Sequence, residues 1–346
     1  MSGSDDDGSL HTPLCDLLGC KVPVLLAGMG GVSRWELASA VTNAGGFGTL
    51  GMVREAPGVI ADEIKAMQAA TDRPFAVNLI PGATEPGLLD AQIALCLELG
   101  VTAFSFFWDV VPNALTRVKA AGGLVLHQVG TVETAQMAED AGADVIIAQG
   151  IEAGGHVHGR APALDLAERI LARTRLPVVV SGGIATGEGL AAALAIGASG
   201  VQCGTAFLAT EESFAHPYHK SRVVDASSEE TVLTDIFVLN WPAGAAVRVI
   251  GNSVTRKLDG NLLGHDPETL PRQPIAWDGE QPRLRFSTDS PLRTTTGSLE
   301  EMALYAGLSA GEIRNVVPAQ TRLRDIVAQA KEALGRTGAL KSKVAS

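Results

Sequence analysis

A glycine-rich segment at residues 148–159 carries the side chains best suited to chemistry in this chain. Glu152, His156 and His158 lie there among four glycines, directly after the apolar run Val145–Ala148, which is typical of a buried strand. Glycine allows the backbone to approach a ligand closely and to adopt positive φ at little steric cost. Loops that follow strands often hold functional residues. A surface turn would also explain the glycines, but we interpret the segment as part of a binding site.

His156 is the candidate catalytic residue of this segment. An imidazole ionises near neutral pH, so it can exchange a proton with a substrate or orient an anion. A core histidine would be unusual on so glycine-rich a loop. We expect Glu152 to anchor the loop by accepting backbone N–H bonds, and we expect no catalytic role for His158.

Two further glycine loops indicate a site for a phosphorylated ligand. They lie at Ser181–Ile184 and Cys203–Thr205, each after a strand-like run. Their backbone N–H groups, together with the amino end of the helix that begins near Thr186, favour an anion. Tight turns without a ligand are the alternative interpretation.

Three side-chain amides stand near the ends of strand-like runs: Asn78, Gln128 and Gln149. If these strands share one sheet, the amides converge and offer donors and acceptors to the edge of a heterocycle. A purely structural role is the alternative for Asn78. His127 faces the opposite side of its strand from Gln128, because side chains alternate along a strand, so we expect it to pack in the core.

The elements that must position these residues alternate between strands and helices. The strand-like runs are residues 21–27, 47–51, 74–80, 103–108, 124–129, 145–150, 177–183 and 200–207. Helical periodicity fills most of the gaps between them, and Ser33 with Glu36 forms a capping box that predicts a helix there. Eight such units fit a closed (β/α)8 barrel of the α/β class, which binds ligands at the carboxyl ends of its strands. An open doubly wound sheet is the alternative, but no G-x-G-x-x-G follows the first strand.

The chain divides into a barrel and additions to it. We expect a disordered tail at residues 1–10 and the barrel at residues 11–210. Residues 211–300 have weak periodicity and should form an insertion or lid over the barrel mouth. Residues 301–335 return to a helical pattern towards the barrel, and residues 336–346 have the composition of a frayed end.

Composition excludes several classes of partner. The 346 residues carry a net charge of −11 without a dense basic block, so we expect no nucleic-acid partner. No apolar run is long enough to span a membrane, and the four scattered cysteines lack metal-ligand spacing. We therefore expect a cytoplasmic protein with a small-molecule substrate, no membrane partner and no metal, which could form a homodimer.

These motifs together resemble the nitronate monooxygenase family of FMN-dependent barrel enzymes, over about residues 12–330. The resemblance rests on the segments Ala27–Ser33, Asn43–Gly48, Gln149–His156, Ser181–Ile184 and Gly204–Phe207, and on Asn78. It implies that Met29, Asn78, Gln149, Gly154 and Gly155 line the flavin, that Gly183, Gly204 and Thr205 hold its phosphate, and that His156 is the active-site histidine. We add Gln128, Ser181 and Gly182 to the expected FMN site.

The resemblance implies oxidation of a small alkyl nitronate, or of its parent nitroalkane, by O2 through bound FMN, giving a carbonyl compound and nitrite. Gly28 stands where the family signature has proline, which favours the related FMN-dependent enoyl-acyl-carrier-protein reductases that use NAD(P)H. A non-catalytic flavin-binding barrel is a third possibility. The acidic net charge favours a small anionic nitronate over a polyanionic dinucleotide.

Overall fold

Eight parallel strands form the centre of the fold. The computed structural model describes residues 10–344, with side chains described as far as Arg336. The strands follow the order β1-β9-β8-β6-β5-β4-β3-β2, and a backbone bridge between Leu25 and Phe47 joins the two edges of the sheet. The strands are β1 (Val24–Leu26), β2 (Thr49–Gly51), β3 (Ala76–Leu79), β4 (Ala103–Phe107), β5 (Leu124–Val129), β6 (Val145–Gln149), β8 (Val178–Ser181) and β9 (Gly200–Cys203). Each lies within a predicted run, so the predicted (β/α)8 barrel is confirmed.

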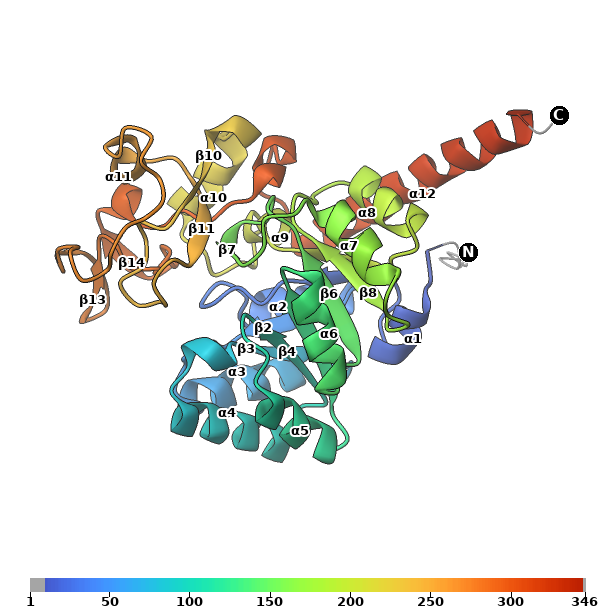
Figure 1. Ribbon diagram of the computed structural model, residues 1–346, viewed down its shortest axis with the longest axis horizontal. Coiled ribbons are helices and arrows are strands. Elements are labelled where there is room, and N and C mark those ends of the chain that lie inside the picture. Colours follow the sequence, from blue (N-terminus) through green and yellow to red (C-terminus); the bar gives the residue numbers. More distant parts are fainter. Residues whose placement is uncertain (1–9, 345–346) are drawn as a thin grey trace.

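Helices follow the strands and cover the outside of the barrel (Figure 1). They are α2 (Trp35–Asn43), α3 (Pro57–Ala70), α4 (Pro86–Glu98), α5 (Pro112–Ala120), α6 (Val132–Asp140), α7 (Ala163–Leu171) and α8 (Gly187–Ala195). Helix α7 shows why they pack there, since Leu166 and Ile170 are buried on one face while Glu168 and Arg169 are exposed on the other. Proline in the first turn of α3, α4 and α5 fixes φ for the start of each helix.

One predicted helix start was wrong. Helix α2 begins at Trp35 after Arg34, and Arg34 makes no side-chain capping bond. The Ser33 hydroxyl accepts a hydrogen bond of 2.9 Å from the backbone N–H of Met29. Ser33 therefore shapes the loop after β1, because its nearest backbone partner lies before the helix and not inside it.

The inward-facing side chains change from apolar to polar along the barrel. At the amino end, Leu25, Ala76 and Leu126 cluster with Leu14 and Leu18 of α1 (Pro13–Leu18). Further along the strands, alternation brings polar residues to the same inner face: Asn78, Ser105, Gln128, Gln149, Ser181 and Gln202. Apolar side chains thus fill the amino end of the barrel. The layer of polar side chains beneath its mouth is here called the polar floor.

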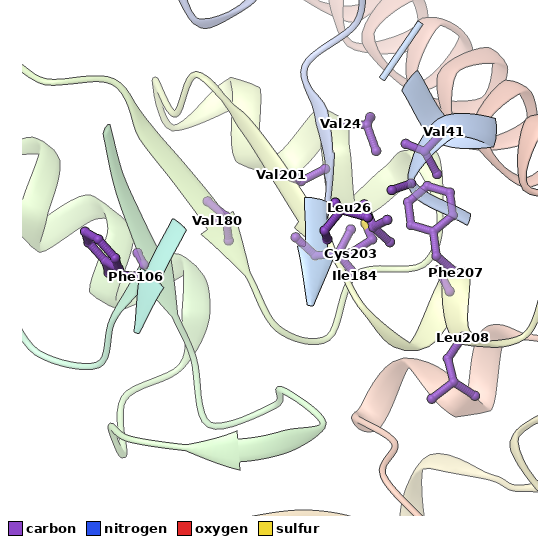
Figure 2. Packing of buried hydrophobic residues seen from close by; sticks show 14 of the residues in the cluster. Val24, Leu26, Val41, Phe106, Val180, Ile184, Val201, Cys203, Phe207 and Leu208 are labelled. Carbon is purple, nitrogen blue, oxygen red and sulfur yellow. The ribbon is translucent and has the colours of Figure 1, made fainter. Parts of the chain in front are cut away.

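The outward-facing side chains form the core between the barrel and its helices. Figure 2 shows part of this cluster, in which Val24 and Leu26 of β1 and Val201 and Cys203 of β9 lie near Val41 of α2. All five are at most 1% exposed. His127 is also fully buried, with its ring 6.4 Å from that of Phe106, as expected for a packing histidine.

Residues beyond α9 (Thr205–Leu208), coloured yellow to orange in Figure 1, form small sheets beside the barrel together with strand β7, which is green. One sheet contains β10 (Thr231–Thr234), β11 (Ala246–Ile250) and β7 (Gly155–Val157), and the other contains β12 (Pro274–Asp278), β13 (Gln281–Leu284) and β14 (Thr295–Gly297). Short helices lie beyond α9 as well: α10 (Pro217–Asp225), η3 (Ser228–Glu230), α11 (Ser253–Arg256), η4 (Leu299–Glu301) and η5 (Leu308–Glu312). A further short helix, η2 (Pro81–Ala83), follows β3 of the barrel.

Strand β7 belongs to the glycine-rich segment, which the sequence analysis treated as a loop. It pairs antiparallel with β11, and His156 lies opposite Val247. A three-residue strand that contains glycine has no alternating pattern of its own, so only its distant partner defines it.

The chain returns to the barrel through α12 (Ala319–Val344), which packs against α8. Gln329 accepts a hydrogen bond of 2.9 Å from the N–H of Gly187. The helix continues past residue 335, where the predicted helical segment ended. Residues 1–9 of the expected disordered tail lie outside the described residues, and Leu10 is buried. Between residues 10 and 344, no helix is both long and apolar enough to cross a membrane.

Candidate active site

A cavity of about 440 Å³ opens at the carboxyl ends of the barrel strands. Its walls combine strand-end loops with residues from the 240s, the 280s and the segment 305–309. All twelve residues predicted to form the site line it: Met29, Asn78, Gln128, Gln149, Gly154, Gly155, His156, Ser181, Gly182, Gly183, Gly204 and Thr205. Their roles toward a cofactor remain predictions.

The polar floor contains a hydrogen-bonded amide cluster. Gln202 of β9 donates from Nε2 to Oε1 of Gln128 at 2.5 Å and to the hydroxyl of Ser181 at 3.3 Å. Strands β5 and β9 are not neighbours, so the bond between their side chains crosses the inside of the barrel. The sequence analysis missed Gln202, although strand alternation in residues 200–203 could have identified it as facing inward.

Asn78 is held close to the loop after β1. Its Nδ2 donates to the carbonyl of Ser105 at 3.0 Å. A Cβ at Gly28 would lie 2.3 Å from the Cβ of Asn78, so position 28 has room only for glycine unless Asn78 moves. A proline at this position would therefore clash with Asn78 where that side chain now lies.

Gln149 uses its amide to hold the part of the glycine-rich segment that carries His156 and His158, here called the histidine loop. Its Nε2 donates to the carbonyl of His156 at 2.8 Å, and its Oε1 accepts from the N–H of His158 at 3.2 Å. Both ends of the amide are therefore engaged by the loop, and the side chain positions His156 more directly than it offers groups to a ligand.

Two charged residues also hold this loop. Glu152 accepts hydrogen bonds from the N–H of Ala163 at 3.0 and 3.2 Å, which confirms its expected anchoring role. Arg248 of β11, only 9% exposed, donates to the carbonyl of Ile151 from Nη2 at 2.9 Å and from Nε at 3.2 Å. The loop is thus held by the barrel on one side and by the added sheet on the other.

His156 lies in an aromatic cage. Its ring stacks on Trp241 with centroids 3.7 Å apart and planes 27° from parallel, and the rings of Tyr305 and Trp108 lie 5.9 and 6.2 Å away. Among the described residues its Nε2 has no hydrogen-bond partner. Burial, assisted by the charge of Arg54, lowers the pKa of His156 to about 3. The imidazole is therefore neutral at physiological pH.

His158 has a different setting. It is not among the residues that line the cavity, and its ring lies 4.8 Å from that of Trp108. Burial lowers its pKa as well. That it has no catalytic role remains a prediction.

The backbone is strained at Arg54, which lines the cavity, and at Trp108, which follows the cavity-lining Phe107. Trp108 has φ of +79° and Arg54 has φ of +58°, both in the left-handed region that non-glycine residues seldom adopt. Such strain persists where the surroundings hold it, commonly at functional sites. The sequence analysis missed Trp108, Arg54, Trp241 and Tyr305 because nothing in their local sequence marks them.

The two predicted phosphate loops lie together beneath the segment 305–309. Gly182 and Gly183 have φ of +110° and +72°, which favour glycine. The hydroxyl of Thr205 accepts from the N–H of Gly307 at 3.0 Å. A Cβ at Gly154 would lie 2.4 Å from the nitrogen of Gly307, so this glycine permits a close approach of two backbones.

The fold and the cavity define the class of protein: an α/β-barrel enzyme whose ligand site lies at the carboxyl ends of the strands. A sequence model of the nitronate monooxygenase family matches residues 11–329, and the chain therefore belongs to that family, as its motifs predicted. Between residues 10 and 344, no group of three or more His, Cys, Asp or Glu side chains is arranged to hold a metal ion.

Known relatives have more than one activity. The chain is 33% identical over 355 residues to a nitronate monooxygenase of Pseudomonas aeruginosa, an alignment that covers 90% of this chain and 97% of that protein. It is 38% identical over 227 residues to (3aS,4S,5R,7aS)-5-hydroxy-7a-methyl-1-oxo-octahydro-1H-indene-4-carboxyl-CoA dehydrogenase of Mycobacterium tuberculosis, covering 65% of this chain and 63% of that protein.

Two solved structures superpose on nearly the whole chain. FabK from Thermotoga maritima superposes with a TM-score of 0.81 at 30% identity, covering 95% of this chain and 99% of that one. Nitroalkane oxidase from Streptomyces ansochromogenes superposes with a TM-score of 0.75 at 31% identity, covering 94% and 99%. Family membership and these neighbours identify the chain as an oxidoreductase of the nitronate-oxidising family.

Proposed function

We propose that this enzyme uses FMN to oxidise small alkyl nitronates with O2, giving a carbonyl compound and nitrite. The observation that carries the proposal is the position of His156, a neutral imidazole in an aromatic cage above the polar floor of one cavity. A cavity of about 440 Å³ is in the range of cofactor and ligand sites.

The residues around the cavity fit FMN. A Cβ at Gly204 would meet Ala27 and Met29 only at ordinary contact distances of 3.6 and 3.7 Å, and this glycine borders the cavity, so a phosphate group there could approach its backbone. Gly183 and Thr205 line the same region, and Asn78 and Gln128 offer amides to the edge of a ring. When bound, FMN supplies the chemistry that these side chains lack, the transfer of electrons from the nitronate to oxygen.

The cage and His156 then act on the substrate. The rings of Trp108, Trp241 and Tyr305 surround His156, and apolar surroundings of this kind would strengthen its electrostatic interactions with a bound ligand. With a pKa of about 3, His156 is a weak base that hydrogen-bonds a nitro group more readily than it removes a proton from a neutral nitroalkane. Preformed nitronates are therefore the substrates that the site favours.

The test begins with the purified protein. We expect it to be yellow and to release FMN, not FAD, on heating. Under anaerobic conditions a short-chain nitronate should bleach the flavin rapidly, while NADH and NADPH should do so slowly or not at all. A colourless protein that does not take up FMN would overturn the proposal.

A second candidate function is the reduction of an enoyl thioester by NAD(P)H. It is favoured by the 38% identity to a protein named as a carboxyl-CoA dehydrogenase and by the superposition on FabK. The net charge of −11 disfavours a large anionic dinucleotide. Fast bleaching by NADPH with no response to nitronates would establish this alternative.

A further inference from the structure

Arg54 is a cavity-lining cation without a carboxylate partner. Its Nη1 donates to the carbonyl of Asn240, and its guanidinium lies 5.4 Å from the Trp241 ring centroid. Among the described residues no carboxylate, including that of the adjacent Glu55, lies within ion-pair distance of it. A partly buried cation in this state attracts an anionic ligand.

Arg283 provides the contrast within the same cavity. It also lines the wall, but its guanidinium pairs with Asp278 at 2.8 Å and with Asp289 at 3.4 Å. Its charge is therefore compensated before any ligand enters. Of the two cavity-lining arginines, Arg54 is the one that lacks a counter-ion.

The backbone holds Arg54 in a conformation that it would not adopt by itself. Its φ of +58° lies in the left-handed region, which is costly for a residue with a side chain. The turn there is closed by a hydrogen bond of 3.3 Å from the N–H of Glu55 to the carbonyl of Met52. A strained, anchored backbone that presents a charged side chain to a cavity is a pre-organised arrangement.

Arg54 and His156 have complementary tasks beside Trp241. The Trp241 ring stacks on His156 at 3.7 Å and has Arg54 at 5.4 Å. Because His156 is neutral, it cannot serve as the counter-ion of an anionic substrate. Arg54 is charged and lies beside the same tryptophan ring, so it can do so. The indole N–H of Trp241 is buried without a partner among the described residues, so it is a further donor for an anion's oxygen.

We propose that Arg54 binds the anionic group of the substrate and thereby selects monoanionic nitronates over neutral nitroalkanes of the same shape. A guanidinium offers paired N–H donors that match the two oxygens of a nitronate, as they match a carboxylate. The inference rests on the proposed function, because it takes the nitronate as the substrate.

Two isosteric probes test the proposal without turnover. Isobutyrate resembles the nitronate of 2-nitropropane in shape and charge, and isobutyramide is its neutral counterpart. Calorimetric titration of the cofactor-loaded protein should show that Arg54→Gln weakens isobutyrate binding about tenfold or more, the scale of a lost charge-assisted hydrogen bond. Affinity for isobutyramide should stay within about twofold, since that ligand carries no charge.

Arg54→Lys serves as the matched variant. It keeps the charge but loses the planar fork, so its loss of isobutyrate affinity should be smaller than that of Arg54→Gln. If Arg54→Gln does not fold, Arg54→Lys alone should still bind isobutyrate more weakly than the parent protein while isobutyramide binding is unchanged.

Several results would overturn the proposal. Equal losses for both probes would mean that Arg54 only holds the loop of Trp241, and unchanged binding of both would exclude an anion site. A parent protein that does not prefer isobutyrate to isobutyramide would also exclude it. Failure of nitronates to bleach the flavin would instead contradict the proposed function, while the calorimetric comparison would still decide the role of Arg54.

Discussion

His156 and Trp241 leave two polar atoms without partners in the protein. The Nε2 of His156 and the Nε1 of Trp241 are both buried, and none of the described residues hydrogen-bonds to either. Each unsatisfied group costs about 1–3 kcal/mol. The fold tolerates this cost next to a cavity, where a ligand with acceptor oxygens can remove it. The same burial keeps the imidazole neutral.

The neutrality of His156 predicts the pH dependence of the reaction. Its pKa is lowered from 6.5 to about 3, so the imidazole keeps one protonation state between about pH 5 and 8. We expect kcat/KM for a preformed nitronate, corrected for the substrate's own ionisation, to show no inflection near pH 6.5. An inflection there that disappears in His156→Asn would contradict this expectation.

Replacing His156 should separate catalysis from cofactor binding. We expect His156→Ala to keep its flavin spectrum and to lose roughly 10²-fold in turnover, the usual scale for a lost proton-transfer or orienting group. His158→Ala is the matched control, because His158 shares the loop but does not line the cavity, and its turnover should stay close to that of the parent protein. Similar turnover in the two variants would show that His156 has only a structural role.

At the scale of elements, the site joins the barrel to the added sheets. The strand ends and glycine loops were predictable, because each strand and each helix carries its own periodicity. The partners of the histidine loop were not predictable, because Arg248 and Trp241 lie more than eighty residues away along the chain. Strand β7 exists only through its pairing with β11, and no local pattern encodes such pairing.

The link from Arg248 to the histidine loop can be broken by Arg248→Met. Losing two hydrogen bonds from a buried guanidinium to the carbonyl of Ile151 should let the loop move, and small displacements of a catalytic group cost large factors in rate. We expect turnover to fall about tenfold or more with flavin retained. Arg256→Met is the control, since its ion pair with Glu300 is exposed and worth little. Equal effects of the two substitutions would contradict this role.

The second phosphate loop can be tested by Gly204→Val. Gly204 has φ of −105°, and a Cβ there would meet Ala27 and Met29 at ordinary distances of 3.6 and 3.7 Å, so the backbone tolerates a side chain. The added methyl groups would occupy the space expected for phosphate. We expect a lower flavin content after purification with a nearly unchanged melting temperature of the apoprotein. Full flavin content would mean that the phosphate binds elsewhere.

At the scale of the whole molecule, the two ends of the barrel differ: the apolar core at the amino end stabilises the fold, and the candidate site lies at the other end. Its amino end is filled by apolar strand residues and by Leu14 of α1, and its mouth is polar. The order of strands and helices followed from local periodicity, so the overall architecture was predictable. The arrangement of residues 211–300 was not, because their short strands pair across long intervals and carry weak patterns.

The fold buries His127 and His219 and partly buries His156, all three in the neutral form, and this predicts how stability depends on pH. Burial lowers the pKa of His127 and of His219 to about 4, and that of His156 to about 3. In the unfolded chain each would have a pKa of about 6.5. As pH falls below that value, these histidines bind protons in the unfolded state but stay neutral in the folded state. Their contribution to the free energy of unfolding is therefore fully present above about pH 6.5 and is lost progressively towards pH 4.

Each buried histidine can contribute up to about 1.4 kcal/mol per pH unit within that range. His127→Leu removes one of the three titrating groups from a packed position that contacts Phe106 and lies away from the cavity. We expect its melting temperature to fall less steeply than that of the parent protein between pH 6.5 and 5, with a smaller difference above pH 7. Parallel slopes for the two proteins would show that His127 is protonated in the folded state as readily as in the unfolded chain.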